Sequence, residues 1–245
     1  STVTNVTSPE FCDIGYKANN PLHLKFTKRD SSIFLRYVST GVTTDNLQKA
    51  MNNVYGDPIL YAYDVKAYNP DSTAVVIDVT PIFTTDMKEF AFLPTTIMGL
   101  IQLNSTFNKD GVALGEVKAF DDNLSVKSML SYKVSLKFMS FSFLDNMSLT
   151  ATVTRSLLLL PEEKMRPRIS DSRVGIFITS KQHVSTEKDG IQNYTLANRW
   201  RMEPKDMAAF KRGELVEPVK PIVFYIDRAT PEFLVPYFIQ AVNVW

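Results

Sequence analysis

Apolar and polar side chains alternate with a period of two along most of this chain, which is the pattern of β-strands that bury one face. In residues 59–68, ILYAYDVKAY, Tyr61 and Tyr63 share one face, while the charged residues beyond them point the other way. The dipeptide Asn69-Pro70 then favours chain reversal, and residues 73–80, TAVVIDVT, repeat the alternation. The sequence therefore predicts a β-hairpin in this region.

A second pair of strands is predicted between residues 131 and 160. The stretch SYKVSLKFMSFSF, residues 131–143, carries apolar side chains at even positions through Phe138 and at odd positions from Met139 onward. A slip of one residue moves every side chain to the opposite face, so we expect a β-bulge at Phe138–Met139 or a strand that crosses between two sheets. Residues 144–147, LDNM, are expected to turn the chain into the next strand.

Helical signals are sparse. Residues 43–54, TTDNLQKAMNNV, combine a possible Thr or Asp cap with apolar side chains at helical spacing, and residues 204–213, PKDMAAFKRG, predict a short helix stopped by Gly213. The predicted fold class is mainly β, an antiparallel β-sandwich or bent sheet with a few short helices.

Changes in amino-acid composition and in hydrophobic pattern along the chain suggest three segments. Residues 1–160 are expected to form an antiparallel β body. The polar, proline-interrupted stretch PEEKMRPRISDSRVG opens a connector with short strands and a helix at 161–218. Residues 219–245 are expected to form a strand and a helix that begin a second domain.

The last segment resembles the opening of a domain. PIVFYI, residues 221–226, is apolar throughout, which is typical of a strand covered on both faces. Thr230-Pro231-Glu232 has the composition of a helix start, although Pro236 either kinks that helix or marks its true beginning. Because the apolar stripe continues to Trp245, we expect the chain to be truncated within this helix.

Composition narrows the function classes. With 27 Lys+Arg against 26 Asp+Glu, the net charge of +1 gives no global attraction to nucleic acid. No apolar run approaches the roughly 20 residues that a membrane-spanning helix needs, and no signal-peptide pattern is found at the start of the chain. A single cysteine, Cys12, excludes an internal disulfide framework.

Catalytic motifs are not found in the sequence. His23 and His183 lie far apart, and neither belongs to an HExxH zinc helix. The nine glycines form no phosphate-binding loop, and Cys12 has no neighbouring histidine. The acid pairs at 121–122 and 162–163 are typical of solvated turns, because adjacent side chains in a strand point apart. We predict no catalytic and no metal-binding residue in this chain.

Two basic clusters are the candidate interaction residues. Their guanidinium groups could grip a carboxylate of a peptide or of a partner domain, or they could pair internally and pin the connector to the body. Two roles are also open for a pair of aromatic side chains. Tyr61 and Tyr63 either line a carbohydrate platform or pack inside the sheet. The candidate docking residues are Arg166, Arg168, Asp171, Arg173, Arg199, Trp200 and Arg201.

Three stretches resemble a known family: AYDVKAYNPDSTAVVIDVT, LLLLPEEKMRPRISDSRVGIF and RWRMEPKDMAAFKRGELVEPVKPIVFYIDRATPEFLVPYFIQAVNVW. From Asp57 to Trp245 the chain is similar to the N-terminal domain of unknown function that precedes the catalytic domain in large bacterial zinc-dependent metallopeptidases of the metzincin type. The resemblance implies a secreted, periplasmic or cell-envelope hydrolase, with zinc in a catalytic domain beyond this chain.

The resemblance transfers no zinc ligand and no general base to this sequence. We therefore expect a non-catalytic accessory region that scaffolds, shields or addresses the active site, inactive on its own and without a cofactor. Its expected partners are the downstream catalytic domain and a peptide or protein substrate. The alternative is a free-standing β-sandwich that binds glycan or peptide.

Overall fold

The computed structural model describes residues 1–245 except 18–20, 39–41, 44–55, 185–190 and 245. The chain divides into two units. Residues 1–162 belong to unit 1, and the described residues from Glu163 onward belong, almost entirely, to unit 2. The expected helix at 43–54 lies almost entirely outside the described residues.

Unit 1 is built from antiparallel strands, which confirms the mainly-β prediction. Its elements are β1 (Thr2–Val6), β2 (Leu24–Arg29), β3 (Ser32–Tyr37), β4 (Val42–Thr43), β5 (Ile59–Tyr68), β6 (Val75–Ile77), α2 (Thr80–Thr84), η1 (Lys88–Phe90), β7 (Thr96–Ile97), β8 (Ile101–Phe107), η2 (Lys109–Gly111), β9 (Ala113–Ala119), β10 (Asn123–Phe138) and β11 (Phe141–Leu158).

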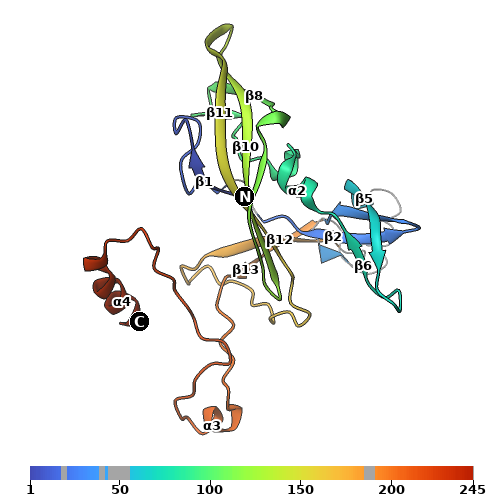
Figure 1. Ribbon diagram of the computed structural model, residues 1–245. Coiled ribbons are helices and arrows are strands. Elements are labelled where there is room, and N and C mark those ends of the chain that lie inside the picture. Colours follow the sequence, from blue (N-terminus) through green and yellow to red (C-terminus); the bar gives the residue numbers. More distant parts are fainter. Residues whose placement is uncertain (18–20, 39–41, 44–55, 185–190, 245) are drawn as a thin grey trace. The chain divides into compact units, whose positions relative to one another are not determined.

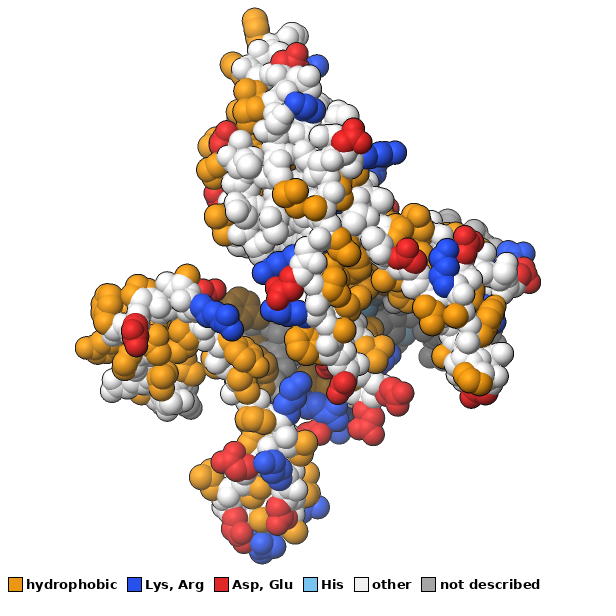
Figure 2. Space-filling view, viewed as in Figure 1, with side chains coloured by type: hydrophobic (Ala, Val, Ile, Leu, Met, Phe, Trp, Pro, Cys, Tyr) orange, Lys and Arg blue, Asp and Glu red, His pale blue; other side chains and the backbone are white. Residues whose placement is uncertain are grey.

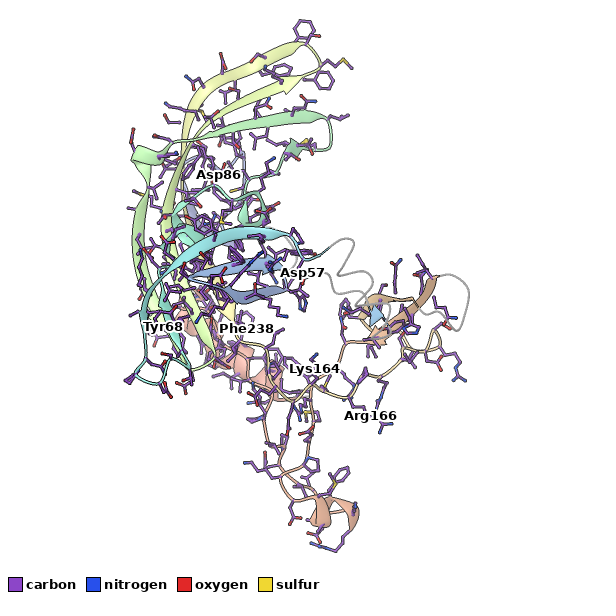
Figure 3. All side chains as sticks on the ribbon, turned by 90° about the vertical axis from the view of Figure 1, so that its right-hand side faces the viewer. Asp57, Tyr68, Asp86, Lys164, Arg166 and Phe238 are labelled. Atoms are coloured by element: carbon purple, nitrogen blue, oxygen red, sulfur yellow. The ribbon has the colours of Figure 1, made fainter. Side chains whose placement is uncertain are left out.

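The larger sheet has the order β1-β11-β10-β8-β7. β8 pairs with residues 132–137 of β10, and β9 pairs with residues 124–129 of the same strand. Figure 1 shows β10 and β11 running side by side as the longest strands, and Figure 3 shows that they bend along their length. The smaller sheet has the order β2-β3-β5-β6, and its last two strands form the hairpin predicted around Asn69-Pro70.

The predicted turn and the predicted bulge have exchanged places. Phe138 pairs with Phe141, so Met139 and Ser140 form the hairpin turn where a bulge was expected. The LDNM stretch is not a turn but an irregularity within β11, where Asn146 has φ 57°. The prediction was wrong because Met139 adopts φ 52°, a conformation that costs a non-glycine residue about 1–2 kcal/mol and leaves no turn signature in the sequence.

Two apolar clusters fill unit 1. The first lies on the larger sheet and is closed by residues near the N-terminus and by Phe92. The second joins the smaller sheet and α2 to the far half of β10 through Val126. Alternation along β10 explains both clusters, because its even-numbered residues from Val126 to Val134 are all buried. Fully buried members include Val3, Leu35, Ile82, Leu130, Leu149 and Val153.

Unit 2 contains β12 (Ile178–Val184), β13 (Ile191–Ala197), α3 (Met207–Lys211), η3 (Glu232–Leu234) and α4 (Val235–Asn243). β12 and β13 are neighbours in a small sheet. The short helix predicted at 204–213 is confirmed: Asp206 caps it by accepting from the backbone N–H of Ala208 at 2.9 Å, and Gly213 follows it with φ 86°.

The C-terminal segment differs from its prediction in one respect. Residues 221–226 form no strand, and Tyr225 is 92% exposed. A strand needs a neighbour that accepts its backbone hydrogen bonds, and within the described residues none pairs with this stretch. The helix does form, and Pro236 lies in its first turn, so the proline marks the start of α4 rather than a kink.

Candidate docking surface on the connector

Backbone pairing brings the two basic clusters together. The N–H of Ser170 donates to the carbonyl of Thr195 at 2.8 Å, and the N–H of Ala197 donates to the carbonyl of Arg168 at 2.9 Å. The connector around Ile169 therefore runs antiparallel to the end of β13. The sequence indicated the clusters separately, and this pairing makes them one surface, which we call the arginine surface: Arg166, Arg168, Asp171, Arg173, Arg199, Trp200 and Arg201.

Three of these arginines have no acidic partner among the described residues. Arg166 and Arg168 are exposed, and in the part of the chain that the structure describes no carboxylate lies within salt-bridge distance of either of them or of Arg199. Arg199 donates from Nη2 to the carbonyl of Arg166 at 2.7 Å, but its buried Nε has no described partner. Figure 3 labels Arg166 and the neighbouring Lys164 on this connector. These three guanidinium groups retain the capacity to bind an acid.

The other two arginines are neutralised locally. Arg173 donates from Nε to both carboxylate oxygens of Asp171, at 2.9 and 3.1 Å. This hydrogen bonding lowers the pKa of the Asp171 carboxyl. Arg201 donates from Nε to Glu203 at 2.6 Å, and Glu163 lies 3.7 Å from its Nη2. Internal pairing therefore holds for part of the surface and not for the rest.

The aromatic candidates do not form a platform. Trp200 is 60% exposed, but Tyr63 is only 3% exposed and contacts Tyr61 with ring centroids 4.7 Å apart. Burial in the core of unit 1 was the competing interpretation of this tyrosine pair, and it holds for Tyr63. A carbohydrate platform that uses the ring of Tyr63 is excluded.

A buried polar cluster in unit 1 was missed by the sequence analysis. Arg155 is 3% exposed and donates to the carbonyls of Ile82 at 2.6 Å and Phe90 at 3.2 Å. Nearby, the hydroxyl of Tyr132 donates to Asp86 at 3.0 Å. Burial lowers the pKa of Arg155, while Tyr132 and Asp86 oppose that shift. The cluster ties the α2–η1 segment to β10 and β11, and Figure 3 labels Asp86 within it.

No metal or membrane-spanning element is found among the described residues. They contain no group of three or more His, Cys, Asp or Glu side chains arranged to hold a metal ion. None of the described helices is long and apolar enough to cross a membrane. Surface depressions near Arg36 and near Tyr37 are open and shallow. In the depression near Arg36, the guanidinium group of that residue already has a partner within the protein, because it donates to the carbonyl of Asp57 at 2.7 Å.

Fold and surface together define a mainly-β protein whose antiparallel sheets are followed by an extended connector with an arginine surface. Residues 15–205 match the family described as Domain of unknown function (DUF5117), and the chain belongs to that family. The match ends within the connector, at residue 205, and includes the whole arginine surface. No curated protein and no solved structure matches the chain.

Proposed function

We propose that this chain is the non-catalytic accessory region of a zinc-dependent metallopeptidase, and that the arginine surface docks an acidic surface of the catalytic domain. The observation that carries the proposal is the unequal pairing of the arginines. Arg173 and Arg201 have carboxylate partners, whereas Arg166, Arg168 and Arg199 have none among the described residues.

Guanidinium groups suit this role because their planar forks bind carboxylates through two parallel hydrogen bonds. Exposed Trp200 adds an apolar contact next to Arg199, and aromatic and arginine side chains are common anchors of protein interfaces. The partner is suggested by the resemblance of residues 57–245 to the N-terminal domain that precedes the catalytic domain in zinc metallopeptidases. In this proposal the zinc ion, its ligands and the general base belong to the catalytic domain, in a secreted or cell-envelope enzyme.

The test is an Arg166→Ala/Arg168→Ala double variant of the full-length protein. We expect peptidase activity or the thermal stability of the catalytic domain to fall, because two charge-assisted contacts are lost. Arg173→Ala is the matched control, since its charge is already paired with Asp171. Docking through this surface is refuted if the double variant equals the wild type in both activity and stability.

A further inference from the structure

Two neighbouring turns of unit 1 carry exposed methionines in a conformation that methionine disfavours. Met98 has φ 53° and is 89% exposed; Met139 has φ 52° and is 82% exposed. Glycine or asparagine would occupy such positions without steric cost, and a polar residue would be better hydrated. Both the backbone and the side chain are therefore unfavourable in water at each turn. Departures of this kind from local rules are concentrated at functional sites.

Strand register places the two turns at one end of the larger sheet. The pairing of β8 with β10 ends at Gln102↔Lys137, so Leu100 and Met139 both lie two residues beyond the same pair. β7 leads into the first turn, and its Thr96 pairs with Gln102 of β8. We call the residues 97–101 and 138–143 the apolar tip. Apolar side chains lie at the top of Figure 2, with an acidic and a basic side chain close below them, and Figure 3 shows both turns pointing the same way.

Further large apolar side chains surround the two methionines: Leu100 is 70% exposed, Phe141 71% and Phe143 66%. The only charged residue within 95–103 and 137–144 is Lys137. The nearest carboxylate along β11, Asp145, accepts a hydrogen bond from Ser135 at 3.0 Å behind the tip. The opposite end of β10 differs, because its turn carries Asp121 and Asp122.

Backbone groups that face across each hairpin at the tip are paired, whereas the outer edges of β7 and of residues 141–147 of β11 have no strand neighbour among the described residues. Phe138 pairs with Phe141, and Ile97 pairs with Ile101. Inside the first turn the N–H of Leu100 donates to the carbonyl of Ile97 at 3.2 Å. The paired groups can leave water without a large desolvation penalty, and the unpaired edges restrict insertion to the interfacial layer, where water and lipid headgroups can bond them.

We propose that the apolar tip inserts into the interfacial layer of a lipid bilayer and holds unit 1 at a membrane surface. A narrow projecting tip needs no matching groove in a fluid lipid layer, and flexible methionines adapt to such surroundings. Lys137 lies at the base of the tip, where its ammonium meets lipid phosphates while its stem follows the apolar side chains. The absence of carboxylates from residues 95–103 and 137–144 gives the tip the charge that this interface requires.

The test is flotation of the 245-residue chain with phosphatidylcholine vesicles. We expect the wild type to float with neutral vesicles, and added anionic lipid to strengthen binding by about fivefold at most, the contribution of one lysine. A Met98→Asn/Met139→Asn variant should bind at least about tenfold more weakly, because two exposed side chains lose their apolar surface. Its melting temperature should stay level or rise, since asparagine tolerates a positive φ.

Phe120→Asn is the matched control. Phe120 is 62% exposed, but it lies at the acidic end of β10, so its replacement should leave flotation unchanged. The proposal is overturned if the wild type does not float with either vesicle type, if the double variant floats as well as the wild type, or if the control loses binding equally. Binding only to anionic vesicles would also overturn it, because the apolar tip would then contribute nothing.

Discussion

Two buried tyrosines of unit 1 differ in a single hydrogen bond. The hydroxyl of Tyr132 donates to Asp86 at 3.0 Å, whereas the buried hydroxyl of Tyr63 has no partner among the described residues. An unpaired buried hydroxyl loses its hydration without compensation. The same chemical change, removal of one hydroxyl, should therefore have opposite consequences at the two positions.

We predict that Tyr63→Phe leaves the free energy of unfolding unchanged or raises it by up to about 1 kcal/mol, and that Tyr132→Phe lowers it by about 0.5–1.5 kcal/mol. Urea denaturation of both variants at neutral pH measures the difference. A Tyr63→Phe variant that is clearly less stable than the wild type would show that this hydroxyl has a partner.

The pH dependence of stability is a second test of the environment of Tyr63. Burial, with smaller contributions from Tyr61 and Asp78, raises the pKa of Tyr63 from 10.0 to about 12. The folded state therefore holds this proton more tightly than the unfolded state, so its stabilising effect is present below pH 10 and is lost as pH rises from 10 to 12. Tyr63→Phe should lose less stability than the wild type as the pH rises from 10 to about 12.

Arg155 shows what residue patterns can reveal and what they conceal. Alternation along β11 assigns Leu149, Ala151 and Val153 to the buried face, and Arg155 is the next residue on that face. The sequence thus indicated a charged side chain on the buried face of a strand. Its partners were not visible, because the carbonyls of Ile82 and Phe90 belong to a distant segment that only tertiary structure brings close.

Among the elements, the β10–β11 hairpin was predicted in its strands but not in its connection. Asp145-Asn146 has the composition of a turn, and the Met139-Ser140 pair does not. Cross-strand pairing over most of both strands decides the register, and its contributions outweigh local turn preferences. The asparagine therefore provides a left-handed residue for a bulge, while methionine occupies the turn.

The conformation of Asn146 leads to a prediction at this scale. Asn146 has φ 57°, and its backbone N–H donates to the side-chain hydroxyl of Ser135 at 3.0 Å. Asn146→Gly should change stability little, whereas Asn146→Val should cost about 1–2 kcal/mol, because a β-branched side chain clashes in the left-handed region. Thermal unfolding of the two variants compares them. Equal stability of the two would contradict a bulge at this position.

For the whole molecule, composition and periodicity predicted the class of fold but not the distribution of the core. A continuous apolar run is the same in sequence whether or not a neighbour covers it, so residues 221–226 were expected to be a buried strand, and in the structure they form no strand and are exposed. The arginine candidates were found by composition, whereas their division into paired and unpaired groups depends on where Asp171, Glu163 and Glu203 lie.

The distribution of buried residues predicts which unit carries the stability. Among the described residues, the buried apolar side chains all belong to unit 1 except Ala209. Because burial of apolar surface is the main source of folding free energy, residues 1–162 expressed alone should unfold cooperatively. We expect a melting temperature within about 5 °C of that of the 245-residue chain, which corresponds to a change of 1–2 kcal/mol.

Residues 163–245 form the matched counterpart of this experiment. With so little apolar surface buried, they should show no cooperative transition in calorimetry and rapid amide exchange outside α3 and α4. The opposite pattern, a cooperative 163–245 fragment and a non-cooperative 1–162 fragment, would mean that the folding energy resides in contacts other than the two apolar clusters. Because the arginine surface lies in unit 2 and the apolar tip in unit 1, the same fragments also separate the two proposals: vesicle flotation should persist in residues 1–162.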